Sequence, residues 1–240
     1  DVYNVIKQIF DVSSEMVTDS YYGRKILAAF YAYGGDYDFC RFYSCGGGLI
    51  HIYNAGMVID GDPDINEVEM FICMTKPAAV EMKSDIALQL CSAYENVHRT
   101  LFRVKSVESG IDPNNVKVNS YTDKCFAVLN KSFDKMLPYD DWYVDISHRI
   151  RHNISKLYWY DNTTVTQQFN INGFVFLSHI ATAPHTRGRG TARKLLWLIG
   201  SEAEKSGETA YLFALDHRRS FYETIGFEPV GEDILYEMKG

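Results

Sequence analysis

A short turn rich in glycine and arginine is the part of the sequence best suited to chemistry. The segment His185–Ala192 contains Arg187, Gly188, Arg189 and Gly190 and no carboxylate. Glycine lets the backbone approach a ligand closely, and successive N–H groups in such a turn form a concave site for anions. A phosphate or diphosphate is the ligand that this composition favours. The simpler alternative is an ordinary turn whose glycines only relieve steric strain.

Two elements must hold this turn in place. Before it, Phe174–Thr182 is rich in aromatic and β-branched residues and is expected to form a buried strand, which Pro184 ends because proline has no N–H for a sheet. After it, the apolar residues adopt helical spacing from Thr191 onwards. They are Leu195, Leu196, Ile199 and Ala203, and Arg193, Lys194, Glu202 and Lys205 fall on the opposite side. Because the first N–H groups of a helix lack partners and carry partial positive charge, the predicted unit is strand, anion-binding turn, helix.

A second motif follows this helix. After an expected strand, Thr209–Leu215, residues 220–227 read SFYETIGF. The spacing Arg187-x-x-Gly190-x-Ala192 resembles motif A of the GNAT superfamily of acyl-CoA-dependent N-acyltransferases. Residues 220–227 resemble the Phe-Tyr-Glu-x-x-Gly-Phe segment of the same family. Two motifs in the family's order are more specific than either motif alone.

The resemblance implies that acetyl-CoA is the acyl donor. The residues that it assigns to this cofactor are Ile180, Ala181, Thr182, Arg187, Gly188, Arg189, Gly190, Thr191 and Ala192. In the resembled family the backbone of the strand pairs with the pantetheine arm, and its exposed N–H groups could meet the thioester carbonyl. A role as a plain core strand is compatible with these contacts.

The resemblance also implies a general acid. Tyr222 matches the family's acid, because a phenol can donate its proton to the sulfur as the thiolate leaves. The alternative is an aromatic side chain that only packs beside Phe221 and Phe227.

The general base is less clearly indicated. Many members of the family use a carboxylate on or near the central strand, but Phe174–Thr182 contains none. His179 has a suitable pKa for this role, and Asp145 or Asp216 could approach from other segments. A buried, hydrogen-bonded histidine is the alternative for His179. Asp216 also opens a loop where the family often carries an Asn, which puts the contacts to the lower pantetheine arm in doubt.

The segment Asp140–His152 is expected to be a charged helix. His148 and His152 would lie one turn apart, but a third metal ligand is missing and neighbouring arginines oppose a cation, so no metal site is predicted. In the resembled family this part of the chain often lines the acceptor side. Trp142, Asp145 and His148 are therefore candidates for the substrate pocket, with an exposed charged helix as the equal alternative.

Composition narrows the class of protein. The chain has 240 residues, of which 46% are hydrophobic and 23% charged, the balance of a soluble globular protein. The net charge of −7 argues against a nucleic-acid partner. Residues 1–120 carry 16 acids and 10 bases, and residues 121–240 carry 15 acids and 14 bases. This acidic surplus would steer a cationic amine towards the protein. The five cysteines lack metal-ligand spacing and are interpreted as reduced thiols of a cytoplasmic protein.

The two halves of the chain are expected to be separate domains, 1–112 and 113–240. In the first half, helices are expected at Val2–Phe10, Arg24–Tyr33, Asn66–Met74 and Asp85–Tyr94, and strands at Tyr37–Ser44, Leu49–Val58, Ala78–Met82 and His98–Val107. The second half is expected to add a helix at Thr122–Met136 and strands at Ser155–Tyr160, Thr163–Asn170, Glu228–Val230 and Ile234–Met238. Gly46–Gly48 is not a phosphate loop, because strands flank it on both sides. Glu108–Asn115 is the best linker.

The expected fold class is α/β (α+β), with a GNAT-like mixed, mostly antiparallel sheet flanked by helices and an N-terminal domain of similar type. The order of elements in the first half resembles a GNAT domain without motif A, so a degenerate tandem copy is one interpretation.

The expected function is acetyl transfer from acetyl-CoA to a primary amine of a small molecule or protein, by direct attack in a ternary complex. The alternative is a non-catalytic acyl-CoA-binding regulatory or sensor module. Neither a nucleic acid nor a membrane is an expected partner, and the oligomeric state is open, a homodimer being one option.

Overall fold

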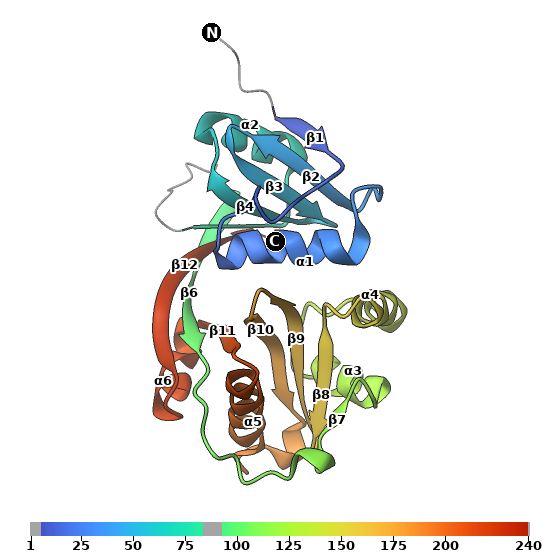
Figure 1. Ribbon diagram of the computed structural model, residues 1–240, viewed down its shortest axis with the longest axis vertical. Coiled ribbons are helices and arrows are strands. Elements are labelled where there is room, and N and C mark those ends of the chain that lie inside the picture. The colour runs from blue at the N-terminus through green and yellow to red at the C-terminus, as the bar shows by residue number, and fades with distance from the viewer. Residues whose placement is uncertain (1–5, 84–92, 240) are drawn as a thin grey trace. The chain divides into compact units, whose positions relative to one another are not determined.

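The computed structural model describes residues 6–83 and 93–239, and the chain divides into two units (Figure 1). Unit 1 comprises Asp1–Thr100 with Gly231–Gly240, and unit 2 comprises Leu101–Val230. This division differs from the expected 1–112 and 113–240. The last strand of the chain returns to the sheet of unit 1, and Ile111 of the expected linker is buried in the core of unit 2.

Unit 1 is a mixed sheet with two helices. Its strands are β1 (Lys7–Ile9), β2 (Cys40–Cys45), β3 (Gly47–Tyr53), β4 (Gly56–Asp62) and β5 (Ala79–Met82), with parts of β6 (Tyr94–Arg103) and β12 (Glu228–Met238), in the order β1-β2-β3-β4-β5-β12-β6. The helices are α1 (Tyr21–Tyr33) and α2 (Ile65–Thr75). The β4–β5 pair is parallel, whereas the pairs β1–β2, β2–β3, β3–β4 and β5–β12 are antiparallel.

Unit 2 has the same kind of architecture. Its strands are β7 (Lys117–Val118), β8 (Lys156–Tyr160), β9 (Thr163–Ile171), β10 (Phe174–Thr182) and β11 (Thr209–Leu215), in the order β6-β11-β10-β9-β8-β7. Its helices are α3 (Thr122–Asn130), α4 (Tyr139–Arg151), α5 (Thr191–Lys205) and α6 (Asp216–Thr224), with short 3₁₀ turns at Pro113–Asn115 and Pro184–Thr186. The β10–β11 pair is parallel, and the pairs β7–β8, β8–β9 and β9–β10 are antiparallel. The expected fold class is therefore confirmed.

Helices cover both faces of the unit 2 sheet. On one face, Leu195, Leu196 and Ile199 of α5 pack against Val175 and Leu177 of β10. On the other face, side chains of α3 and α4 pack in a second cluster with Leu157 and Ala181. The apolar side predicted for α5 is thus the buried side, because an amphipathic helix gains stability by burying its apolar stripe.

Several expected elements differ from the structure. Lys7–Ile9 is a strand, not part of a helix at Val2–Phe10, and it pairs with β2. The expected strand Leu49–Val58 is a hairpin of β3 and β4, because Asn54 turns the chain at a φ of 50°. Helix α3 ends at Asn130 instead of Met136. The two strands expected at the C-terminus are one strand, β12.

Two expectations fall on undescribed residues. The helix expected at Asp85–Tyr94 lies outside the described residues apart from its end, and Tyr94 begins β6. Cys91 also lies outside them. Of the other cysteines, Cys40, Cys45 and Cys125 are buried thiols, and Cys73 is an exposed thiol. Across the described ranges, the structure contains no helix both long and apolar enough to pass through a bilayer.

Candidate active site

The two parallel strands of unit 2 separate halfway along their length. Phe174 to Leu177 of β10 pair with Thr209 to Leu212 of β11, but the strands continue to Thr182 and Leu215. Beyond Leu177, the register between these strands shows no further pairs within the described residues. The facing backbone groups of the two strands are therefore open to another hydrogen-bonding chain. We call this opening the β10–β11 fork.

A β-bulge in β10 lies at the start of the fork. The register between β9 and β10 shifts between Ser178 and Ala181, and His179 adopts a φ of 46°. This left-handed conformation is unusual for a residue other than glycine and often marks a functional site. The bulge also changes the alternation of side chains, because Leu177 and Ile180 contact the α5 side while Ala181 packs on the α3 and α4 side.

The glycine turn connects the fork to α5. Gly188 and Gly190 have φ values of 82° and 74°, which only glycine adopts at little cost. Gly190 is the N-cap residue of α5 and supplies no side-chain oxygen, so the first N–H groups of the helix have no side-chain cap. They remain able to bind an anion.

Basic side chains surround this turn. Arg187 holds it in place, because its Nε donates to the main-chain oxygen of Thr182 at 3.0 Å and its Nη2 donates to Ser132 at 3.3 Å. Arg189 and Arg193 are exposed, and the guanidinium of Arg193 lies 5.0 Å from the centre of the Trp197 ring.

Tyr222 lies on the α5 side of the sheet. Its ring centre is 5.6 Å from that of Phe102 and 5.9 Å from that of Phe227, and it packs against the same apolar cluster as α5. Trp197 helps to fix this arrangement, because its indole N–H donates to the main-chain oxygen of Ile225 at 3.2 Å. Burial raises the pKa of Tyr222 to about 12, and Arg218 acts in the opposite direction. Within the described chain, no hydrogen bond engages the phenol hydroxyl.

His179 contacts the other face of the sheet. Its ring centre is 5.5 Å from that of Phe133, a residue that packs against the α3 and α4 cluster. Its Nδ1 lies 3.0 Å from Nε2 of Gln168 and 3.1 Å from Oγ of Ser178. Burial lowers the pKa of His179, and the charge of Arg149 lowers it further, so the imidazole is neutral at physiological pH.

The tautomer of His179 decides its chemistry. If Gln168 donates to Nδ1, then Nε2 carries the hydrogen and is a donor. If Nδ1 carries the hydrogen and donates to Ser178, then Nε2 is free to act as a base. Both forms fit the same heavy-atom positions when the amide of Gln168 is turned over.

The other candidate residues lie on α4 and α6, and not on β10. Trp142 is buried in the α3 and α4 core against Phe126 and Tyr139, which is the position of a packing residue. Asp145 is half-buried on α4, and Asp216 is exposed in the first turn of α6. His148 stacks near His152, with 4.2 Å between ring centres.

Three polar residues at the bulge were missed by sequence reasoning. They are Arg149 of α4, Gln168 of β9 and Ser178 of β10. Thr163–Asn170 is polar at most positions, so its alternation does not reveal which side chains share a face. Their grouping depends on the β9–β10 register, which no local pattern specifies.

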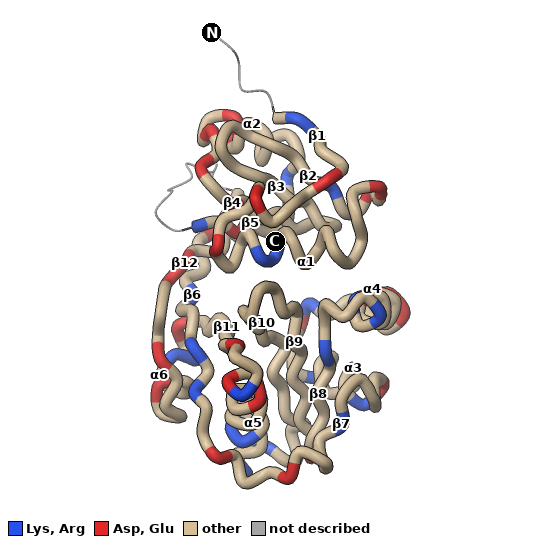
Figure 2. The backbone as a smooth tube through the Cα atoms, in the orientation of Figure 1, with Lys and Arg blue, Asp and Glu red and all other residues tan. Residues whose placement is uncertain are grey.

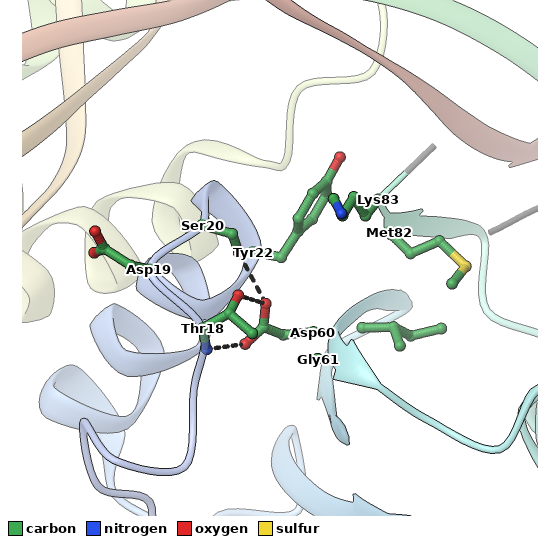
Figure 3. A pocket seen from close by; sticks show the side chains of 9 residues that line it. Thr18, Asp19, Ser20, Tyr22, Asp60, Gly61, Met82 and Lys83 are labelled. Carbon is green, nitrogen blue, oxygen red and sulfur yellow. Dashed lines mark hydrogen bonds between the residues drawn. The ribbon is translucent and has the colours of Figure 1, made fainter. Parts of the chain in front are cut away.

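Unit 1 contains a second strand–helix–strand unit of the same kind. Gly56 to Val58 of β4 pair in parallel with Ala79 to Glu81 of β5, and α2 connects the two strands. Beyond these pairs lies a cavity of about 300 Å³, lined by Thr18–Ser20, Tyr22, Ile59–Gly61, Met82 and Lys83 (Figure 3).

In unit 1, carboxylates lie at the corresponding places: beyond the paired part of β4 and β5, and at the start of α2. Asp60 accepts hydrogen bonds from the N–H of Thr18 at 2.7 Å and from Ser20 Oγ at 2.8 Å. Asp64 caps α2 by accepting from the N–H groups of Asn66 and Glu67 at 3.0 and 3.2 Å. Figure 2 shows acidic positions around α2. A diphosphate would therefore meet an occupied helix N-terminus and negative charge in unit 1, in contrast to the turn before α5.

Known structures provide an independent comparison. The sequence matches no protein-family model and no curated protein significantly. The fold, however, is similar to that of a GCN5-related N-acetyltransferase from Sphaerobacter thermophilus, with a TM-score of 0.58 and 12% identity over 96% of this chain and 94% of the other. A GCN5-related N-acetyltransferase from Kribbella flavida gives a TM-score of 0.56 and 13% identity over 84% of this chain and 90% of the other.

A third structure extends the likeness to nearly the whole chain. An acetyltransferase from the GNAT family of Colwellia psychrerythraea gives a TM-score of 0.54 and 13% identity over 98% of this chain and 99% of the other. At such identities the likeness concerns the fold. The chain has the fold of the GNAT acetyltransferases.

Proposed function

We propose that this protein is an N-acetyltransferase that transfers an acetyl group from acetyl-CoA to a primary amine by direct attack in a ternary complex. The observation that carries this proposal is the combination of the β10–β11 fork, the uncapped glycine turn and the partly buried phenol of Tyr222 on the α5 side. Each part corresponds to one requirement of acyl transfer from a thioester.

The turn would hold the diphosphate of acetyl-CoA. The N–H groups at the start of α5, including those of Thr191 and Ala192, have no side-chain cap, and the nearby Arg189 adds positive charge. The pantetheine arm would then enter the fork and pair with the backbone of β10 at Ile180, Ala181 and Thr182. Such pairing uses strand edges that the sheet itself leaves open.

The reaction requires three events at the fork. The neutral amine attacks the thioester carbonyl, the negative charge on the carbonyl oxygen is stabilised by backbone N–H groups, and the carbon–sulfur bond breaks. Tyr222 donates its proton to the leaving sulfur, because its phenol is protonated at physiological pH and has no competing acceptor among the described residues. The amine proton leaves through Nε2 of His179, in the tautomer that leaves this nitrogen unprotonated, or through water.

The direct experiment is mass spectrometry after incubation with acetyl-CoA and a panel of amines. The panel contains polyamines, aminoglycosides and amino acids. An increase of one acetyl group on any amine, with release of CoA, supports the enzyme. Tight binding of acetyl-CoA without product would instead support a non-catalytic acyl-CoA sensor.

A further inference from the structure

Among the described residues, the guanidinium of Arg149 forms no ion pair with a carboxylate, and it lies near the bulge of β10. Its Nη2 donates to the main-chain oxygen of Gln168 at 3.3 Å, which is a long contact to a neutral acceptor. Its Nε is buried and has no hydrogen-bond partner among the described residues. A guanidinium whose Nε is buried and unsatisfied is costly to the fold unless a hydrogen-bond acceptor such as an anion is supplied from elsewhere.

The contacts of Arg149 lead to the polar side chains at the bulge of β10. Gln168 connects Arg149 to the bulge, because its main-chain oxygen contacts the guanidinium while its side-chain Nε2 lies 2.7 Å from Oγ of Ser178 and 3.0 Å from Nδ1 of His179. Gln168, Ser178 and His179 are only partly buried. Burial lowers the pKa of His179, and the charge of Arg149 acts in the same direction.

The local charge is opposite to that of the whole protein. The last turn of α4 contains His148, Arg149 and Arg151. Its acidic residues Asp140 and Asp141 lie in the first turn, and Asp145 lies half-buried one turn before Arg149. A polycation would therefore meet an unpaired positive charge at the bulge, despite the net charge of −7. The planar guanidinium of arginine matches a carboxylate, because it can donate two parallel hydrogen bonds to the two carboxylate oxygens.

We infer that Arg149, with Gln168 and Ser178, binds the carboxylate of the acceptor, so that the acceptor is a small amine that carries a carboxylate, such as an amino acid. The inference rests on the proposed acetyl transfer. The carboxylate binds Arg149 while the amine lies at His179 and the start of the fork. Arg149 and His179 both contact Gln168, so the two groups of the acceptor are separated by only a few bonds.

The test compares amino acids with their amides, which keep the amine but lack the negative charge. The wild-type protein is expected to show kcat/KM at least about tenfold higher for the acid than for the amide, the size of one charge-assisted hydrogen bond. Arg149→Met removes this preference. Arg149→Lys keeps part of it, because lysine restores the positive charge but cannot donate two parallel hydrogen bonds. Arg151→Met is the matched control on the same helix, where an exposed arginine is replaced, and it keeps the wild-type ratio.

The readouts separate the two proposals. Calorimetry with acetyl-CoA tests the donor site alone, and every variant is expected to bind acetyl-CoA as the wild type does. Transfer to amides and acids at equal rates, or loss of both in equal proportion in Arg149→Met and Arg149→Lys, overturns the acceptor inference and leaves the acetyltransferase intact. No acetyl-CoA binding, or no transfer to any amine, overturns the proposed function and this inference with it.

Discussion

Tyr222 is the residue on which the proposed chemistry can be tested most directly. Its side chain is held by aromatic packing and not by a hydrogen bond, so removing the hydroxyl leaves the packing unchanged. Tyr222→Phe should lower kcat by about 10²-fold or more, the usual contribution of a general acid, with little effect on acetyl-CoA affinity. Release of CoA thiol measures kcat, and calorimetry measures the affinity.

The control for Tyr222 is Tyr160→Phe, because Tyr160 of β8 packs partly buried against the same cluster. It should retain wild-type kcat. With a pKa of about 12, the phenol of Tyr222 stays protonated through the neutral range, so the rise in rate with pH reflects deprotonation of the acceptor amine and has the same shape in both variants. An unchanged kcat in Tyr222→Phe would remove this residue from the mechanism.

At the scale of an element, the glycine turn before α5 should bind the diphosphate of acetyl-CoA. Gly190→Asp places a carboxylate at the N-terminus of α5, where it competes with the diphosphate for the free N–H groups. The affinity of the Gly190→Asp variant for acetyl-CoA should fall by at least about tenfold, equivalent to about 1.4 kcal/mol of binding free energy. Gly190→Asn is the matched control, since Asn has the same shape, tolerates the φ of 74° and carries no charge. Equal affinities of Gly190→Asp and wild type in calorimetry would count against the diphosphate site.

A buried network of charges joins α1 to three strands of unit 1. Glu81 of β5 contacts Lys25 of α1 and Arg99 of β6, and Arg99 also binds Asp233 of β12 at 2.5 Å. Burial alone would raise the pKa of Glu81, but Lys25 and Arg99 lower it to about 2. The pairs therefore stabilise the ionised carboxylate strongly.

Glu81→Gln should lower the free energy of unfolding by about 3–5 kcal/mol at pH 7, because Lys25 loses its buried carboxylate partner and Arg99 keeps only Asp233. The pKa of Glu81 is depressed, so its stabilisation is fully present above the ordinary pKa of 4.5 and disappears as pH falls towards 2. The difference between variant and wild type should shrink over that range in urea unfolding. Glu223→Gln, which breaks the exposed pair with Arg219, is the control and should cost less than about 1 kcal/mol. Equal losses in the two variants would show that the network contributes no more than a surface pair.

At the scale of the whole molecule, the described residues contain two parallel strand pairs that separate, β4–β5 and β10–β11, and the turn before α5 is the helix start suited to a diphosphate. In unit 1 the carboxylate of Asp64 occupies the helix N-terminus, and Asp60 is hydrogen-bonded to Thr18 and Ser20 within the fork. Titration calorimetry should therefore give one acetyl-CoA per chain. Two equivalent sites per chain would show that the carboxylates of unit 1 do not exclude the cofactor. The interpretation of residues 1–112 as a degenerate copy stays a prediction, supported by the parallel β4–β5 pair.

The sequence determined the elements whose signals are local. The strands Phe174–Thr182 and Thr209–Leu215 and the start of α5 at Thr191 agree with the structure, because each has a strong period and a clear end at proline or glycine. The two motifs also indicated the fold. By contrast, Leu49–Val58 conceals a turn at Asn54, since an apolar run does not show where a hairpin reverses.

Only the tertiary structure decided what surrounds the fork. It placed Tyr222 of α6 on the α5 side. It placed His179 on the side of α3 and α4, where a bulge at Ser178–Ala181 shifts the alternation of β10. It also brought Arg149 of α4 to Gln168 and thereby to His179. These contacts join residues far apart in sequence through strand register and helix packing. Neither quantity is encoded in local spacing, so the candidate acceptor site could be found only in the folded chain.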